Sequence, residues 1–258
     1  MTQFDQATLL NAHAHRQVRL EGARNVRDMG GLPVIGGGRT RRGVLFRADT
    51  LASLTDGGVA SLQALRIKTV VDLRTPDERT RAPDRLPASD LKVHLLGFLP
   101  AGNSELLAGI NSGTLDADRA RTCMQDQYRK LALDHLAEFR QLFTILLEAE
   151  HHPVLFHCAS GKDRTGVAAA VTLLALDIPP DLIVEDYTVS NYQRRPVDLF
   201  GPGAAPTAIE QVMAADPDYL RTALAAMQER YGSTDAYLLH GLGLDTTARG
   251  RLKTLLVD

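Results

Sequence analysis

Cys158 and Arg164 are the residues whose types and spacing most directly suggest chemistry. A cysteine thiolate is a strong nucleophile, and a planar guanidinium can grip two oxygens of a tetrahedral anion at once. Five residues separate the two side chains, and the intervening segment contains Gly161 and Lys162, which favour a tight, cationic loop. The spacing therefore predicts a site that holds a phosphate group and attacks its phosphorus.

The segments on either side of this loop predict how it is held. Residues 153–157 are a short apolar run typical of a buried strand, and residues 167–176 are an Ala/Val/Leu run typical of a helix. A loop between a strand and a helix N-terminus turns backbone N–H groups inward and meets the positive end of the helix dipole. That field favours anions, and it favours thiolate over thiol at Cys158.

Residues 157–166, His-Cys-Ala-Ser-Gly-Lys-Asp-Arg-Thr-Gly, resemble the His-Cys-x5-Arg-Thr motif of the cysteine-dependent phosphatases. The full string is similar to the atypical bacterial protein tyrosine phosphatases of triple specificity, which include phosphoinositides among their substrates. Four other stretches resemble the same family: Arg24–Gly31, Arg47–Asp49, Val70–Arg74 taken with Glu78, and Asp186–Tyr192.

The resemblance implies the cysteine-phosphatase fold of the α/β class. We expect a mostly parallel central sheet flanked by helices, a small N-terminal antiparallel hairpin region and a helical lid insert. A single phosphatase domain is expected over residues 1–258, with the lid at about 100–118 and a C-terminal helical extension at about 203–258. Helical periodicity over residues 119–150 predicts one long helix.

The proposed chemistry assigns catalytic roles to Cys158, Asp163 and Arg164. In the wider superfamily the proton donor is the Asp of a Trp-Pro-Asp loop, but this chain contains no tryptophan. Asp163, inside the loop as in the family it resembles, is therefore the predicted general acid. Asp72 and Asp77 remain alternatives, since both follow the predicted strand at residues 68–73 and are expected on the same rim of the sheet.

The remaining loop residues are expected to bind substrate. Thr165 can donate a hydrogen bond to the thiolate, or it can be an ordinary first-turn hydroxyl, and Lys162 goes with tolerance of phosphoinositide head groups in the resembled family. The accessory residues are expected to order the loop or to form structural ion pairs. The predicted substrate-binding set is Ala159, Ser160, Gly161, Lys162, Thr165 and Gly166, and the accessory set is His157, Asp72, Arg74 and Asp77.

Composition excludes several classes of function. The formal net charge of −2 argues against a nucleic-acid partner, and the two cysteines argue against a disulfide framework. No run approaches the ~18 apolar residues of a membrane span, so we expect a soluble, cytoplasmic protein, with export by a non-classical route left open. The pairs His13/His15 and His151/His152 lack the partners of a metal site, and we expect neither a metal nor a cofactor. The oligomeric state is left open.

The sequence thus predicts a phosphomonoester hydrolase that acts on phosphotyrosine, and on phosphoserine or phosphothreonine, in proteins through a phosphocysteine intermediate. Two alternatives remain within the same site: a phosphoinositide phosphatase, and a catalytically weak module that binds phosphorylated partners. A sulfur-transfer or arsenate-handling enzyme is disfavoured because no resolving cysteine lies near Cys158 in the sequence.

Overall fold

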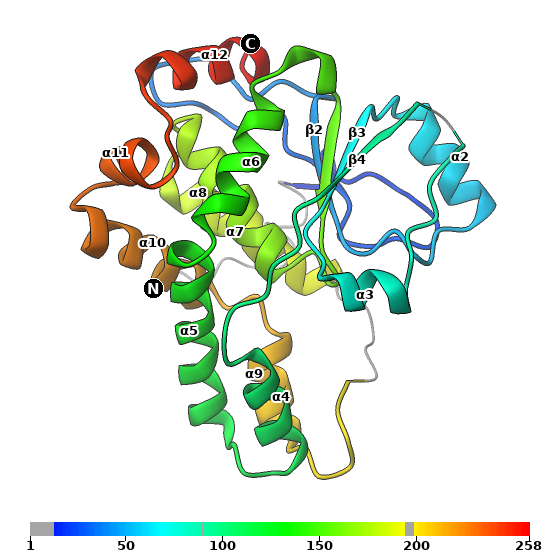
Figure 1. Cartoon of the computed structure of the whole chain (residues 1–258), viewed down its shortest axis with the longest axis vertical. Helices are drawn as coiled ribbons and strands as arrows, with labels where there is room; N and C mark the ends of the chain where they lie inside the picture. Colours follow the sequence, from blue (N-terminus) through cyan, green and yellow to red (C-terminus); the bar gives the residue numbers. More distant parts are fainter. Residues whose placement is uncertain (1–12, 89, 194–198) are drawn as a thin grey trace.

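The computed structural model describes residues 13–88, 90–193 and 199–258. Its centre is a five-stranded sheet in the order β1-β2-β5-β3-β4, shown in Figure 1. The strands are β1 (Arg27–Asp28), β2 (Leu45–Ala48), β3 (Thr69–Asp72), β4 (Lys92–Leu95) and β5 (Val154–His157). Strands β2, β5, β3 and β4 are parallel, and β1 is antiparallel to β2. The predicted α/β class with a mostly parallel sheet is confirmed.

Helices cover both faces of this sheet. In Figure 1, α6, α7 and α8 lie on one side and α2 on the other. The helices are α2 (Asp56–Ala64), α3 (Pro76–Arg81), α4 (Asn103–Asn111), α5 (Ala117–Leu133), α6 (Leu136–Leu146), η1 (Ala149–His151), α7 (Asp163–Ala175), α8 (Pro180–Thr188), η2 (Val189–Gln193), α9 (Pro206–Met213), α10 (Pro217–Tyr231), α11 (Thr234–Ala236), η3 (Tyr237–Gly241) and α12 (Thr246–Leu256).

Alternate residues of the central strands face two separate cores, as the period of a strand requires. Val71 and Phe156 belong to the larger core, whereas Val70 and Leu155 belong to the smaller one. All four side chains are fully buried, which is the pattern of a parallel sheet covered on both faces. Helix α7 is buried from Arg164 to Ala175, so it lies inside the larger core.

The glycine-rich N-terminal segment forms the predicted hairpin. Pro33 and Arg39 pair across a tip made by Gly36, Gly37 and Gly38, all at positive φ. Positive φ suits glycine, which has no Cβ to clash with the backbone. The interpretation of these glycines as a turn, and not as a phosphate cradle, is therefore confirmed.

The prediction of a single helix over residues 119–150 is wrong. Helix α5 ends at Leu133 and α6 begins at Leu136, and the ring of the intervening His135 packs against Phe98 at a centroid distance of 4.5 Å. Asp134 and His135 are weak helix formers, so the break costs little there. The break lets α5 extend away from the sheet while α6 stays packed near it (Figure 1).

Helices α4, α5 and α9 together form the lower projection of the molecule in Figure 1. Helix α4 lies within the segment predicted as a lid, and its Leu106 and Ile110 are buried. Three of the helices after residue 203 add side chains to the larger core: Ala208 from α9, Tyr219 from α10 and Leu252 from α12.

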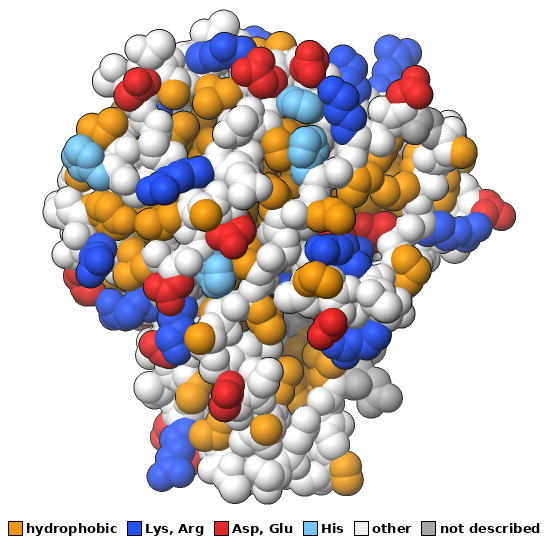
Figure 2. Space-filling model, viewed as in Figure 1, with side chains coloured by type: hydrophobic (Ala, Val, Ile, Leu, Met, Phe, Trp, Pro, Cys, Tyr) orange, Lys and Arg blue, Asp and Glu red, His pale blue; other side chains and the backbone are white. Residues whose placement is uncertain are grey.

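Across the surface in Figure 2, acidic and basic side chains are interspersed, in keeping with the small net charge. In the part of the chain that the structure describes, every helix is too short or too polar to cross a membrane.

Candidate active site

The loop at residues 158–162 joins β5 to α7, as predicted. Cys158 directly follows β5 and is only 1% exposed, and α7 begins at Asp163. Gly161 has φ of +65°, and a Cβ there would lie 2.6 Å from the Ala48 carbonyl oxygen. Only glycine fits this turn, because both its conformation and its closeness to β2 exclude a side chain.

A cavity of about 750 Å³ opens above the loop. Ala159, Ser160, Lys162, Asp163 and Arg164 line its floor. Most of its apolar wall comes from three parts of the chain: α4, α5 and the segment from residue 199 to the end of α9. These wall residues are Leu106, Leu107, Met124, Leu131, Leu199, Phe200, Val212 and Met213. The floor is therefore polar and cationic, while the walls suit a hydrophobic or aromatic group.

Glu78 holds the guanidinium of Arg164. The two Arg164 Nη atoms each donate to one Glu78 carboxylate oxygen at 2.6 Å, and Nη1 also donates to the Leu73 carbonyl at 3.1 Å. Burial alone would raise the pKa of Glu78, but the bonds and charge of Arg164 outweigh it and lower that pKa to about 2. The bidentate pair fixes the plane of the Arg164 fork at the edge of the cavity.

Glu78 is not among the site residues predicted from the sequence, although together with the stretch Val70–Arg74 it resembles the phosphatase family. Thr75 and Glu78 form the capping box that starts α3: Glu78 N donates to Thr75 Oγ1, and Thr75 N donates to Glu78 Oε2. A capping box explains a glutamate at this position without any partner elsewhere in the chain. Only the fold reveals that the same carboxylate also reaches Arg164.

Two tyrosines hold the carboxylate of Asp163. Tyr128 of α5 donates to Asp163 Oδ1 at 2.8 Å, and its hydroxyl lies 2.6 Å from that of Tyr187 on α8. Both tyrosines are buried, whereas the Asp163 side chain is about one third exposed. No local pattern in the sequence marks Tyr128, which occupies an ordinary core position of its helix. Tyr187 lies in the stretch 186–192 that resembles the family, but nothing in that stretch connects it with Asp163.

Lys162 is turned toward α9 in this structure. Its ammonium group donates to the carbonyls of Val212 and Ala214, the latter at 3.1 Å, and lies 3.1 Å from Asp163 Oδ1. These carbonyls are at the C-terminal end of α9, where a cation is favoured by the helix dipole. Lys162 therefore ties the floor of the cavity to one of its walls.

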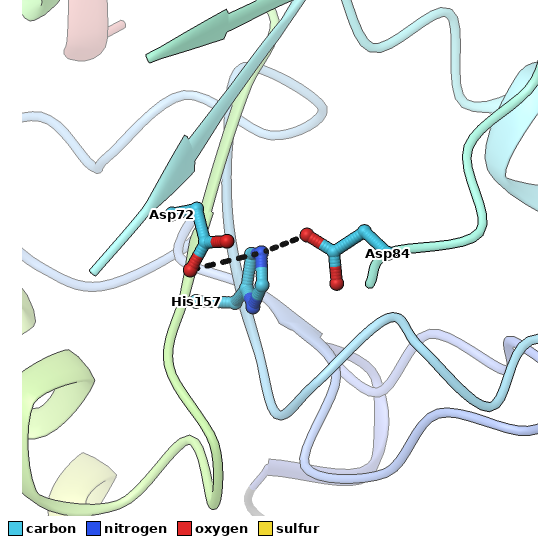
Figure 3. Close-up of side chains that lie close together, drawn as sticks. All are labelled: Asp72, Asp84 and His157. Carbon is cyan, nitrogen blue, oxygen red and sulfur yellow. Dashed lines mark ion pairs between the residues drawn. The ribbon is translucent and has the colours of Figure 1, made fainter. Parts of the chain in front are cut away.

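His157 and three charged residues form a buried network behind Cys158. His157 Nε2 lies 3.0 Å from Asp84 and 3.8 Å from Asp72, as Figure 3 shows. Arg74 pairs with both carboxylates at 2.8 Å. Burial would raise the pKa of Asp72, but the Arg74 hydrogen bond and the nearby His157 and Arg74 charges lower it. Because Arg74 already pairs with both carboxylates, we interpret this cluster as an ion-pair network and not as a metal site.

The other predicted residues fall in different places. Asp77 is exposed on the cavity wall, whereas the buried Asp72 belongs to the network behind the loop. Thr165 is fully buried, and within the described chain its hydroxyl has no hydrogen-bond partner. A Cβ on Gly166 would lie 3.0 Å from the Tyr187 ring, so this glycine lets α7 and α8 pack closely.

Comparisons with known proteins agree with this geometry. A family model described as "Tyrosine phosphatase family" matches residues 18–258. The triple specificity protein phosphatase PtpB of Mycobacterium tuberculosis is 30% identical over 277 residues, covering 92% of this chain and 98% of PtpB. A tyrosine-protein phosphatase of Nostoc commune is 28% identical over 211 residues, covering 74% of this chain and 67% of the relative.

Among solved structures, the catalytic core of the PP-IP phosphatase SIW14 from S. cerevisiae is similar with a TM-score of 0.37 and 16% identity, over 72% of this chain and 90% of that one. So distant a likeness adds nothing to the assignment, which rests on the family model and on the length of the match to PtpB. The chain belongs to the tyrosine phosphatase family.

Proposed function

We propose that this protein hydrolyses phosphotyrosine, and also phosphoserine and phosphothreonine, in proteins through a phosphocysteine intermediate. The observation that carries the proposal is the floor of the cavity, which joins a strand-to-helix loop containing Cys158 to the Arg164 fork and the Asp163 carboxyl group. This arrangement supplies a nucleophile, an oxyanion clamp and a proton donor within one turn of chain.

In the first half-reaction, the Cys158 thiolate attacks phosphorus in line with the leaving oxygen. The sulfur–phosphorus bond forms as the bond from phosphorus to the leaving oxygen breaks, and the proton of Asp163 passes to that oxygen. Backbone N–H groups of the loop and the Arg164 guanidinium hold the equatorial oxygens while charge is redistributed.

In the second half-reaction, the Asp163 carboxylate takes a proton from water as the water oxygen bonds to phosphorus. The sulfur–phosphorus bond breaks, inorganic phosphate is released and the thiolate is restored. Thr165 suits a role in this step, because its buried hydroxyl can donate to the departing thiolate. Atoms and protons balance over the two steps, and Asp163 ends protonated as it began.

Asp163 is preferred over the other two acids on position. It lines the floor of the cavity and is oriented by Tyr128. Asp72 is buried and paired with Arg74, and its pKa is lowered, so it is poorly placed to give a proton to a substrate. Asp77 lines the cavity too, but on the exposed first turn of α3. It remains the alternative donor.

The cavity walls support an aromatic substrate. Phe200 and the apolar side chains of α4 and α9 surround the space above the loop, and apolar walls favour the ring of phosphotyrosine over the short side chain of phosphoserine. The M. tuberculosis relative is named for triple specificity, which supports including phosphoserine and phosphothreonine.

Phosphoinositide hydrolysis is a second candidate for the same site. Arg81 also lines the cavity and Lys162 lies on its floor, whereas the guanidinium of Arg74 is held between Asp72 and Asp84. Extra cations around the reacting phosphate suit a substrate that carries several phosphate groups. Use of Lys162 for this purpose requires its ammonium group to leave the carbonyls of Val212 and Ala214.

We also propose that α4, within the predicted lid segment at about 100–118, regulates access to the loop together with α9. Both helices supply apolar wall residues above the floor, and opening either one would admit a large phosphoprotein. This extends the expectation from the sequence, which placed the lid at about 100–118 and treated residues 203–258 only as a C-terminal helical extension.

The test is release of inorganic phosphate from p-nitrophenyl phosphate, with and without vanadate, by the parent and by Cys158→Ser. The parent should turn over and be inhibited, and the variant should be inactive yet still bind phosphate, because a serine hydroxyl is not ionised at neutral pH. Substantial turnover by Cys158→Ser would exclude the covalent mechanism. A panel of phosphotyrosine peptide, phosphoserine peptide and phosphoinositide then ranks the substrate classes, and binding without phosphate release would identify a binding module.

A further inference from the structure

Three consecutive carbonyl groups of the phosphate loop are held from outside by one N-terminal segment, residues 25–50. The Thr50 N–H donates to the Ala159 carbonyl at 3.2 Å. Asn25 Nδ2 donates to the carbonyls of Ser160 at 3.4 Å and Gly161 at 2.9 Å. Arg47 Nη2 donates to the same Gly161 carbonyl at 2.9 Å.

The direction of these carbonyls sets the direction of the N–H groups that an anion would use. In a trans peptide unit the C=O and the following N–H point in opposite directions. With the carbonyls of residues 159–161 turned outward, the N–H groups of residues 160–162 turn toward the cavity. The backbone N–H of Lys162 follows this direction, since it makes a long contact of 3.4 Å with the hydroxyl of Ser160, a residue that lines the cavity.

Arg47 is itself fixed by a buried carboxylate. Arg47 Nη1 donates to Asp186 at 2.8 Å, so one guanidinium spans from α8 to the phosphate loop. The same carboxylate accepts from Arg16 at 2.7 Å and from Arg27 at 3.1 Å. All four side chains are at most 1% exposed, so a buried carboxylate holds the Arg47 guanidinium in place.

Asn25 is held just as firmly. Its φ of +54° is left-handed, a region that asparagine tolerates better than most residues, and its Oδ1 accepts from Arg27 Nη1. Asn25, Arg27 and Arg47 lie in two of the stretches that resemble the phosphatase family, and neither of these two stretches contains a predicted site residue.

We infer that Asn25 and Arg47 are positioning residues of the phosphate loop, which keep its N–H groups aimed at the oxyanion by holding its carbonyl groups from behind. The inference rests on the proposed function, because it assigns the loop an anion to hold. Neither residue touches the substrate. Their loss should therefore weaken the binding of every tetrahedral oxyanion at this site, whatever leaving group the substrate carries.

The experiment compares Arg47→Lys with Arg16→Lys. Both keep the charge of the Asp186 cluster, but a single lysine nitrogen cannot occupy both Nη positions from which Arg47 bonds Asp186 and the Gly161 carbonyl. Arg16, in contrast, bonds Asp186 and the Asp28 carbonyl without touching the loop. We expect Arg47→Lys to raise the vanadate inhibition constant about ten-fold and to lower kcat, the usual size of a lost charge-assisted hydrogen bond. Arg16→Lys should lower the thermal midpoint while leaving the vanadate inhibition constant close to that of the parent.

Asn25→Gly is the second test, since glycine accepts the left-handed φ but removes both loop contacts. It should raise the vanadate inhibition constant as Arg47→Lys does, so it tests the positioning role even if Arg47→Lys does not fold. The inference is overturned if the folded variants keep the parental vanadate inhibition constant, or if Arg16→Lys raises that constant as much as Arg47→Lys does. A parent that binds no vanadate would instead overturn the proposed function, so the two failures are distinguishable.

Discussion

Replacing Glu78 by glutamine should remove a defined part of the acid sensitivity of the fold. Glu78 carries a pKa of about 2 against an ordinary value of 4.5, because Arg164 holds its charged form. This depressed pKa contributes stability that is fully present above about pH 5 and is lost as the pH falls through 4.5 toward 2. The glutamine variant has no such carboxyl group to protonate, so this component of the pH dependence is absent from it.

The size of the effect follows from the pKa difference. The 2.5 pH units between 4.5 and about 2 correspond to about 3 kcal/mol, and the 25% exposure of the Glu78 side chain reduces this to about 2 to 3 kcal/mol. At neutral pH, Glu78→Gln should be less stable than the parent by at least this amount, since Arg164 remains buried without its counter-ion.

Urea unfolding of the parent and Glu78→Gln at several pH values between about 3 and 7 measures this difference directly. Asp186 and Asp72, whose pKa values are also lowered, titrate in both proteins and cancel in the comparison. Glu150→Gln is the matched control, because the exposed pair of Glu150 with Lys92 should contribute little. Parallel curves for the parent and Glu78→Gln would refute the assigned pairing of Arg164.

Three further outcomes test the site. Arg164→Lys should lower kcat/KM severely, because a point charge cannot reproduce the bidentate fork, and activity within a few-fold of the parent would remove Arg164 from the site. Asp163→Asn should reduce the turnover of substrates with poor leaving groups about 10²–10⁴-fold more than the turnover of substrates with activated phenols. Tyr128→Phe should show the same dependence on the leaving group more weakly. If only Asp77→Asn shows this dependence, the general acid belongs to α3. Residues 100–118 should exchange amide hydrogens quickly and slow down with vanadate, whereas uniformly slow exchange without ligand would contradict the lid.

The loop could be predicted from the sequence because its requirements are local. The apolar strand, Gly161 and the helix after Asp163 specify a strand-to-helix anion site within one short segment, and the structure places that segment as expected. The alternation of buried residues likewise made the strand of Val70 and Val71 predictable, since each face of a central strand must be apolar.

The partners of the loop could not be predicted, because each lies far away in the chain. Glu78 is 86 residues from Arg164, and Tyr128 is 35 residues from Asp163. Each occupies a position that already has a sufficient local explanation, as a helix cap or as a core aromatic residue. The break between α5 and α6 was missed for a similar reason, since Asp134 and His135 are weak helix formers but not helix breakers.

The charges around the loop explain how a protein of net charge −2 can build a site for a dianion. Lys162 and Arg164 are each matched by a carboxylate, Asp163 and Glu78, and Arg74 lies between Asp72 and Asp84. These pairs orient side chains but add little net field. The cluster around Asp186 differs: its single carboxylate accepts hydrogen bonds from the three guanidinium groups of Arg16, Arg27 and Arg47. Within that cluster the positive charge exceeds the negative, and in a buried setting this excess is screened far less than a surface charge. We therefore propose that this excess favours a phosphate anion held by the loop, acting from the side of the loop opposite the cavity.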